Sequence, residues 1–553
     1  MGAERDNISF VVMGNYYTSN EPNFPDLYPE EFAWYNEEYS KNGNELLPND
    51  EIINTEIKDY VTPTKSYAFH AKLNIDDFEA GYFRNYESHC SSFSVKPEYS
   101  IYTEDAIFGE WVESMYVSHN KKLADQRWQL HTSLSYSKDE IDPKSNYINS
   151  FTSYEKGYKY AFNKALNFEE QVSYFWGDHT SIVAGFSMQD ISALPKSGDL
   201  PFAFDRSTPA NLQNLYYIGT NISDSAGNDL SIYQDFYYLN YQNYAIYLQS
   251  HINIHDKLWI TLGGRYDYNT RYTYSINPRL GLVYSPLKKL RIKLLYGEAF
   301  FAPSPYSAYQ HFGSFIPVRD SITGEVTGLT SSYWRLPPEK KLKSQKIKTY
   351  EASFSYFMNN WIIINVNGFY NDLRNLLSSE GNSGEEFHGI PVDYIQRPVN
   401  KGSSVTYGGT IKIDIKTDIG FTLLSSNLAY SYIDGNIGGE QIPFAAKNTI
   451  KGGISTGIRK FNISTKFIYR SKSYHRSVKD SEGNLIASKP FIVFNTAAKY
   501  NLLRSEKYKL DVFCNIKNLL NTKYYNLPIG GSECFPNVPQ DPIRINIGIN
   551  LSI

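Results

Sequence analysis

Long hydrophobic runs are what this sequence most clearly lacks. One of the longest, Trp361-Ile362-Ile363-Ile364, ends at Asn365, far short of the ~18 apolar residues that a membrane-spanning helix needs. The mean hydropathy of −0.45 also excludes a helical membrane protein. An excess of positive charge is missing too, because 54 Lys and Arg stand against 58 Asp and Glu. The net charge of −4 therefore gives no reason to expect a nucleic-acid partner.

Cysteines and processing signals are also scarce. Three cysteines are too few for a disulfide framework, although Cys90 and Cys534 lie in predicted loops and could pair in an oxidising compartment. Residues 1–7 lack the basic and apolar regions of a signal peptide. We therefore expect the sequence to be missing its beginning.

Motifs of catalysis and metal binding are absent as well. The sequence has no nucleophile elbow, no HExxH motif and no Ser-His-Asp set that strand parity would bring together. Its 10 histidines are scattered without metal-ligand spacing. We therefore expect that the protein is not an enzyme and that it has neither a metal site nor a cofactor.

What the sequence does contain is alternation of apolar and polar residues. Residues 543–553 alternate to the end of the chain, which is typical of a strand with one apolar face. The pattern recurs about twenty times, in segments near the ~9–11 residues with which a tilted strand crosses a bilayer. The 48 tyrosines and 32 phenylalanines suit the aromatic girdles of such strands. The sequence predicts an all-β fold, a transmembrane antiparallel β-barrel of the outer membrane.

Strand direction tests this prediction, because short turns must lie on the periplasmic side and long loops on the extracellular side. The rule is satisfied by about twenty strands in one barrel domain spanning 1–553, the first running outward. It also requires 138–166 to be one extracellular loop, despite the alternation at Tyr158, Tyr160 and Phe162. The predicted strands lie near 7–17, 66–75, 77–86, 107–119, 126–137, 167–176, 180–189, 243–254, 257–268, 277–286, 289–298, 347–357, 361–372, 405–416, 420–433, 446–458, 461–471, 490–501, 506–519 and 542–553.

Parity along these strands places charged residues in the lumen. The residues predicted to face it are Arg265, Asp267, Arg279, Arg291 and Lys293. A lumen this charged is either filled with water or occupied by a polar plug, and about twenty strands are wide enough for a folded domain.

The extracellular loops carry the candidate ligand contacts. Loops 18–65, 190–242 and 299–346 are far longer than ordinary connections, which favours a functional role. Their candidate residues are Trp34, Tyr35, Tyr309, His311 and Trp334. The alternative is that these side chains only pack the loops against one another.

Several stretches resemble the barrel of TonB-dependent outer-membrane receptors, most securely over 180–553. Six occur in family order: Tyr247-Leu248-Gln249, Gly263-Gly264-Arg265-Tyr266-Asp267, Asn277-Pro278-Arg279-Leu280-Gly281-Leu282, residues 296–304, Leu336-Pro337-Pro338-Glu339 with Thr349-Tyr350-Glu351, and residues 518–525. The resemblance implies a receptor in the outer membrane of a Gram-negative bacterium, crossing it many times.

The same resemblance implies active uptake of a scarce nutrient, an iron–siderophore, haem or cobalamin. It implies as partners the outer-membrane lipid and lipopolysaccharide, and the TonB–ExbB–ExbD complex acting through a plug domain. Barrels of this family have 22 strands and follow a signal peptide and a plug. We therefore expect the plug and the first barrel hairpin to be missing here, and the first and last strands to close imperfectly. Three explanations stay open: a truncated sequence, a split gene and a plugless protein. The alternative function is a plugless, passive porin-like channel.

One stretch also resembles haem receptors of this family. Phe300-Phe301-Ala302-Pro303 followed by His311 matches the first two of their three elements, with Phe301 in place of an arginine. The third element is not recognisable. The resemblance makes His311 a candidate axial haem ligand, since neutral imidazole is a good one.

Overall fold

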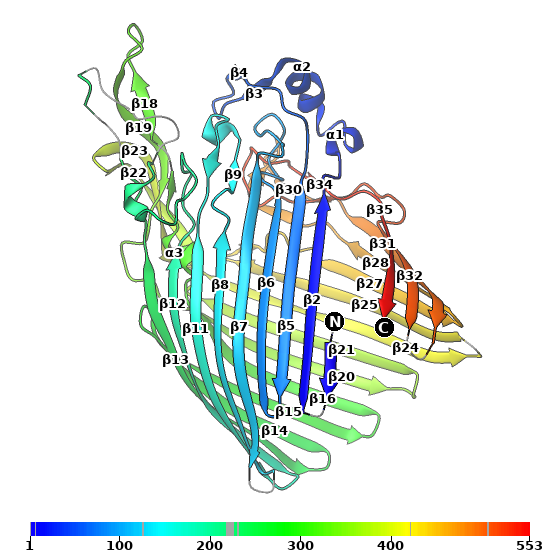
Figure 1. The fold of residues 1–553 in the computed structure, drawn as a ribbon. Helices are drawn as coiled ribbons and strands as arrows, with labels where there is room; N and C mark the ends of the chain where they lie inside the picture. Colours follow the sequence, from blue (N-terminus) through cyan, green and yellow to red (C-terminus); the bar gives the residue numbers. More distant parts are fainter. Residues whose placement is uncertain are drawn as a thin grey trace.

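A single antiparallel sheet, curved into a barrel wall, dominates the structure (Figure 1). This computed structural model describes residues 2–5, 7–123, 126–216, 226–228, 232–313, 315–420, 422–505 and 508–552. The sheet has 22 strands, and all but the short β1 (Gly2–Arg5) and β26 (Glu440–Gln441) are long. The long strands are β2 (Ile8–Ser19), β5 (Thr64–Ile75), β6 (Phe78–Cys90), β7 (Ile107–Leu123), β8 (Trp128–Ile141), β11 (Phe162–Trp176), β12 (Thr180–Leu194), β13 (Leu239–His255), β14 (Leu258–Asn269), β15 (Thr273–Leu287), β16 (Leu290–Phe301), β20 (Gln345–Phe357), β21 (Ile362–Arg374), β24 (Ser403–Ile419), β25 (Thr422–Ile437), β27 (Asn448–Ile458), β28 (Phe461–Arg470), β31 (Phe491–Arg504), β32 (Lys509–Lys517) and β35 (Arg544–Ser552).

Each strand predicted from alternation is present, so the predicted all-β barrel architecture is confirmed. Most strands extend a few residues beyond their predicted ends. For example, the strand predicted at 405–416 is β24, which runs to Ile419. The prediction that 138–166 holds no additional barrel strand is confirmed, but the bounds of this loop were too wide, because β8 runs to Ile141 and β11 begins at Phe162. Within it, β9 (Asn146–Tyr147) and β10 (Gly157–Tyr158) pair only with each other among the described strands.

Exposed apolar side chains explain why these strands suit a membrane. On β35 the four apolar residues of one face, Ile545, Ile547, Ile549 and Leu551, are 59 to 75% exposed. A soluble protein would bury such a face, whereas hydrocarbon covers it at little cost. The described helices are short, and none is long and apolar enough to cross a membrane.

Strand register gathers the aromatic residues into rows. Tyr296, Tyr350, Tyr370 and Tyr407 are direct cross-strand neighbours on β16, β20, β21 and β24. On the other side of the barrel, Tyr16, Tyr67, Tyr86 and Trp111 form an equivalent row across β2, β5, β6 and β7. Both rows lie toward the ends of the strands that carry the long loops. They are therefore the girdle at the outer membrane surface.

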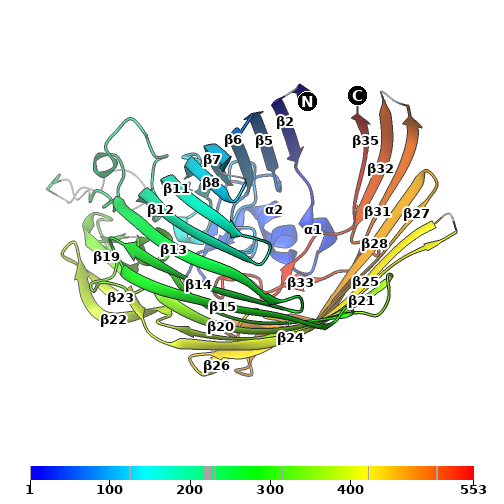
Figure 2. The ribbon, with the colours of Figure 1, turned by 90° about the horizontal axis from the view of Figure 1, so that it is seen from below.

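The sheet does not close into a continuous ladder. In the described part of the chain, β35 pairs with β32 alone, and β1 covers only Ile8–Val11 of β2. The two chain ends face each other between β2 and β35 (Figure 2). This agrees with the expected imperfect closure.

Aromatic side chains join the two sides of this seam at the extracellular end. We call the buried cluster of Phe24, Tyr28, Phe32, Cys90, Tyr102, Phe535 and Val538 the aromatic clasp. It combines the β2–β5 loop, which contains α1 (Phe24–Leu27), with the β32–β35 loop. The Tyr28 hydroxyl donates to the Gln540 carbonyl at 2.7 Å, and the Tyr525 hydroxyl donates to Glu31 at 2.6 Å. The clasp therefore holds the seam together above the membrane.

A second extracellular unit is a five-stranded loop sheet. It contains β17 (Phe312–Gly313), β18 (Ile316–Arg319), β19 (Val326–Arg335), β22 (Leu377–Phe387) and β23 (Ile390–Asn400). Its core includes Tyr216, Phe315, Trp334 and Ile395. The sequence predicted plain loops at 299–346 and 373–404, so this sheet was not foreseen.

Candidate functional site

The upper inner wall of the barrel carries a connected polar network. The Arg265 guanidinium donates to Asp267 at 2.7 Å and to the Ser187 hydroxyl at 3.1 Å. Asn277 donates to the other carboxylate oxygen of Asp267 at 2.9 Å. These residues lie on the face opposite the exposed Tyr266 and Tyr268. A cavity of about 570 Å³ opens between this network and the start of loop 302–344.

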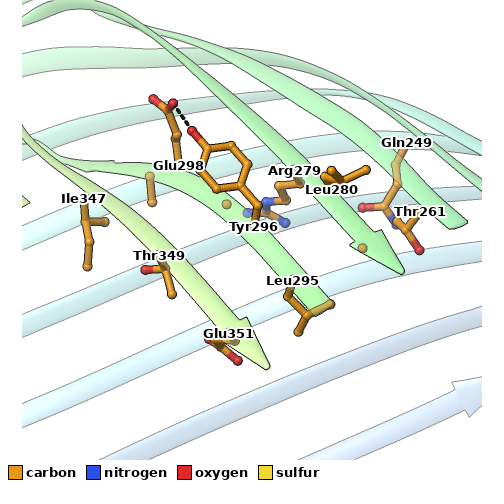
Figure 3. A pocket seen from close by; sticks show the side chains of 13 residues that line it. Gln249, Thr261, Arg279, Leu280, Leu295, Tyr296, Glu298, Ile347, Thr349 and Glu351 are labelled. Carbon is orange, nitrogen blue, oxygen red and sulfur yellow. Dashed lines mark hydrogen bonds between the residues drawn. The ribbon is translucent and has the colours of Figure 1, made fainter. Parts of the chain in front are cut away.

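A lower cavity of about 390 Å³ lies on the wall between β13 and β20 (Figure 3). Its charged lining residues are Arg279, Glu298 and Glu351, and its polar ones include Gln249, Thr261 and Thr349. Gly297 leaves open space, since a Cβ there would meet nothing within 4 Å. Further down β16, the Arg291 guanidinium lies 6.0 Å from the Phe357 ring centroid. The wall therefore offers separated charges of both signs to whatever occupies the lumen.

The extracellular rim has a basic cavity of about 490 Å³. Lys340, Lys341 and Lys343 line it and are exposed, and no ion pair joins them to an acid within the described residues. Arg397 also lines it, paired to Glu339 at 3.2 Å and to Glu385 at 2.6 Å. Sequence reasoning missed this site. Its signal was five lysines within residues 340–348.

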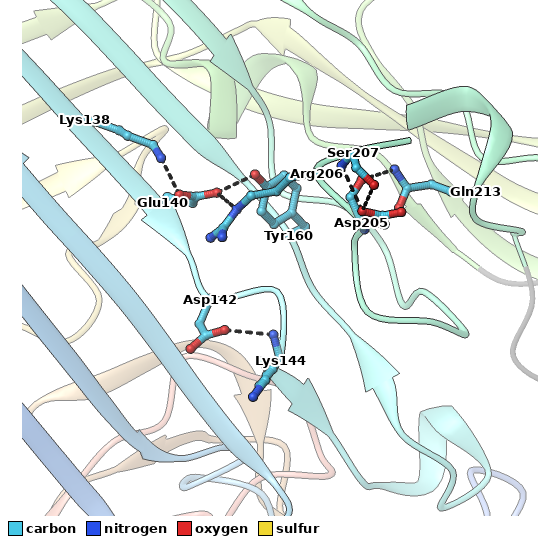
Figure 4. Close-up of polar contacts among 9 residues, drawn as sticks. All are labelled: Lys138, Glu140, Asp142, Lys144, Tyr160, Asp205, Arg206, Ser207 and Gln213. Carbon is cyan, nitrogen blue, oxygen red and sulfur yellow. Dashed lines mark hydrogen bonds and ion pairs between the residues drawn. The ribbon is translucent and has the colours of Figure 1, made fainter. Parts of the chain in front are cut away.

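One buried carboxylate ties an extracellular loop to the barrel (Figure 4). Glu140, at the end of β8, accepts from Lys138 at 2.6 Å, Arg206 at 2.7 Å and the Tyr160 hydroxyl at 2.6 Å. Arg206 also lies over the Trp111 ring, 5.3 Å from its centroid. The segment around Arg206 is therefore fixed and not free to move as a loop tip.

The candidate ligand residues fall into separate groups. Trp34 and Tyr35 lie together above the clasp, where the Trp34 indole donates to the Asn44 carbonyl at 2.9 Å and the Tyr35 hydroxyl accepts from the Tyr60 amide at 3.2 Å. Trp334 is fully buried in the loop sheet, 5.0 Å from the Tyr216 ring. Tyr309 lies beneath the Arg271 guanidinium at 4.7 Å. The structure does not bring Trp34 and Tyr35 into one site with Tyr309 and Trp334. The ligand contacts of these residues stay predictions.

His311 lies at the edge of the same loop sheet. It is 3% exposed, its Nε2 accepts from the Gln234 amide at 2.7 Å, and burial lowers its pKa to about 4. The imidazole is thus neutral, as an axial haem ligand must be. The Nε2 lone pair that would bind iron, however, already accepts the hydrogen bond from Gln234.

We expect haemin titration to leave the Soret band unchanged in both the detergent-solubilised protein and a His311→Ala variant. Coordination would require the Gln234 hydrogen bond to break and the loop sheet to open. A Soret shift in the wild-type protein that disappears in the variant would establish His311 as the axial ligand.

A buried acid makes the extracellular loop 20–63, which we call the cap, sensitive to pH. Glu45, in β3 (Asn44–Leu46), is 1% exposed, and its Oε2 has no hydrogen-bond partner among the described residues. Burial, followed by the charge of Glu98, raises its pKa to about 9, while a hydrogen bond from Tyr154 opposes the shift. Glu45 is therefore protonated at neutral pH in the folded cap.

Replacing Glu45 by glutamine is expected to protect the cap from alkali. In the folded cap the pKa of Glu45 is raised to about 9, above the ordinary value of 4.5 that it has in the unfolded chain. The contribution of Glu45 to the stability of the cap is therefore full below pH 4.5 and is lost as the pH rises toward 9. Proteolysis of loop 20–63 in the wild type should accelerate between pH 5 and 9, and the variant should show no such change. Glu56→Gln, whose side chain is 83% exposed, is the control and should behave as wild type. Equal pH profiles for all three proteins would contradict this assignment.

The described residues contain neither a metal-binding cluster nor a disulfide. No group of three or more His, Cys, Asp or Glu side chains there could hold a metal ion. Cys90, Cys514 and Cys534 are free thiols, and Cys90 and Cys534 are buried. Cys90 is the last residue of β6, although the sequence placed it in a loop.

Comparisons with known proteins agree with the barrel geometry. The sequence pattern of the family described as TonB dependent receptor-like, beta-barrel matches residues 57–519. No curated protein matches the chain. A structure of a variant of the ferric enterobactin receptor PfeA from Pseudomonas aeruginosa, in complex with enterobactin, has a TM-score of 0.69 at 13% identity, covering 100% of this chain and 77% of that one.

Two further solved structures have the same fold. The FrpB iron transporter from Neisseria meningitidis has a TM-score of 0.62 at 13% identity, covering 100% of this chain and 78% of that one. The siderophore receptor PirA from Acinetobacter baumannii has a TM-score of 0.65 at 11% identity, covering 99% and 75%. The matched family consists of outer-membrane barrels of Gram-negative bacteria that act as receptors and transporters, and it is not an enzyme family. With the family pattern spanning most of its length, this chain belongs to the β-barrel family of TonB-dependent receptors.

Proposed function

We propose that this chain is the barrel of an outer-membrane receptor for active uptake of an iron–siderophore complex. The observation that supports this substrate class most is the basic rim cavity, where Lys340, Lys341 and Lys343 lack acidic partners within the described residues. Ferric chelates of catecholate siderophores are anions, and such a cavity attracts them. The three structures compared above are named as an iron transporter, a ferric enterobactin receptor and a siderophore receptor.

The parts of the barrel then have distinct roles. The rim and loops capture the chelate, and the wall anchors the protein in lipid and lipopolysaccharide. The inner-wall charges of Arg265, Asp267, Arg279, Arg291 and Lys293 face the lumen and would contact a plug. Energy would come from the TonB–ExbB–ExbD complex acting on that plug. We further propose that residues 1–553 form one barrel domain, without covalent chemistry or a cofactor.

The same mechanism would serve two other substrate classes. Haem and cobalamin are alternative ligands, and neither is favoured by a specific contact here, because His311 is buried and hydrogen-bonded. The passive porin-like channel gains no support from the family match.

Uptake in cells tests the proposed substrate class. Deleting the gene should abolish energised uptake of one ⁵⁵Fe-loaded siderophore from a panel that includes a ferric catecholate, while uptake of ⁵⁵Fe-haem and ⁵⁷Co-cobalamin stays normal. Reintroducing the gene should restore it. Loss of haem or cobalamin uptake alone would overturn the substrate class and leave the receptor function intact.

A further inference from the structure

The outer face of β16, β20 and β21 carries charges above the tyrosine row. Even-numbered residues of these strands face lipid, as the exposed Leu294, Tyr350 and Phe354 show. One step toward the extracellular side of Tyr296, Tyr350 and Tyr370, the cross-strand neighbours are Glu298, Lys348 and Asp372. The next step holds Phe300, Lys346 and Arg374. Each step is about 7 Å along the strand, so these rows lie at the depth of lipid headgroups.

The cations of this patch are available to an anion. Lys348 lies 3.4 Å from Glu298, and Arg374 lies 2.8 Å from Asp372, with 45% and 69% of the two cationic side chains exposed. Exposed pairs of this kind contribute little to stability because solvent screens them, so a phosphate can compete for both cations. Lys346 forms no ion pair within the described residues. Charge-assisted bonds from two or three cations are the usual means of holding a phosphate.

An apolar groove of about 510 Å³ lies directly below these cations. Leu280, Leu282, Leu294 and three of the row tyrosines form its sides. Its floor is low because Ala352 pairs with Gly368, so two adjacent strands present almost no side chain there. The groove is within the size range of ligand pockets and opens on the lipid side of the wall.

We propose that this patch and groove form a binding site for lipopolysaccharide, with a lipid A phosphate held by Lys346, Lys348 and Arg374 and an acyl chain lying in the groove. Cations above and an apolar trough below match the order of phosphate and hydrocarbon in the outer leaflet. Lipopolysaccharide is chosen over a phospholipid because the patch lies at the extracellular end of the strands, where the long loops begin. The site is independent of the imported substrate.

Native mass spectrometry of the delipidated, detergent-solubilised protein tests the proposal, with diphosphoryl lipid A as the probe. The combined variant Lys346→Gln, Lys348→Gln, Arg374→Gln should bind lipid A at least about tenfold more weakly. Gly368→Leu should weaken binding similarly by filling the groove without altering charge. A Cβ there meets its nearest atom at 3.6 Å, so the strand accepts the substitution.

The matched control replaces three lysines of the opposite, inner face, Lys412, Lys466 and Lys499, by glutamine. It should bind lipid A as wild type does, and heat-modifiable gel mobility should show all variants folded. Unchanged binding in folded outer-face variants, or a loss as large in the inner-face control, would overturn the site. Equal affinity of the wild type for phosphatidylglycerol would overturn lipopolysaccharide as its ligand.

Discussion

Replacing Phe32 by alanine is expected to expose Cys90 and Cys534 to thiol reagents. Phe32 is 2% exposed, and its ring lies 5.3 Å from Phe535, 5.7 Å from Tyr60 and 6.1 Å from Tyr102. Removing such a buried ring costs about 3–5 kcal/mol. The cost falls on the clasp that joins the β2 and β35 sides of the seam, because no strand ladder links them in the described residues.

Maleimide labelling followed by peptide mapping measures the effect. In the wild type both thiols are buried, at 2% and 5% exposure, and should label slowly. The variant should label at both positions at least about tenfold faster, in line with a loss of 1.4 kcal/mol or more in clasp stability. Phe151→Ala, which removes a ring that is 55% exposed, is the control and should label as wild type. Unchanged labelling of the Phe32 variant would show that the seam is held by other contacts.

Replacing Glu140 by alanine is expected to release the loop around Arg206. The substitution leaves Lys138, Arg206 and the Tyr160 hydroxyl without their shared carboxylate. Because the Arg206 side chain is 51% exposed, the cost is that of charge-assisted hydrogen bonds, about 1.5–3 kcal/mol, and not that of a stranded buried charge. Trypsin should then cut after Arg206 far faster than in the wild type. Glu155→Ala removes an exposed acid from a neighbouring loop and should change nothing. If both variants resist trypsin as the wild type does, Arg206 is fixed by stacking on Trp111 instead.

Local alternation was enough to predict the barrel strands, because each strand has one lipid-covered face. Ile545 to Leu551 on β35 are an example, since nothing outside the strand is needed to recognise them. Strand direction then placed the long loops on one side. Cross-strand register was not predictable, so the row of Tyr296, Tyr350, Tyr370 and Tyr407 emerged only from the structure.

The extracellular units depend on contacts between distant segments, which periodicity does not reveal. In the clasp, Tyr28 bonds to Gln540, 512 residues away. In the loop sheet, β19 pairs in parallel with β23, although the intervening chain returns to the barrel for β20 and β21. His311 and Trp334 were selected as loop residues that could meet a ligand, whereas the fold uses both as buried packing residues. Composition could not distinguish these two uses of an aromatic loop.

The initial rate of ⁵⁵Fe–siderophore uptake, measured with and without a protonophore, tests the central claim most directly. Cells carrying the gene should concentrate the chelate, and collapse of the proton gradient should abolish accumulation while surface binding persists. Cells lacking the gene should do neither. Entry that depends on the gene but continues unchanged without the gradient would contradict active import and would instead establish a passive channel.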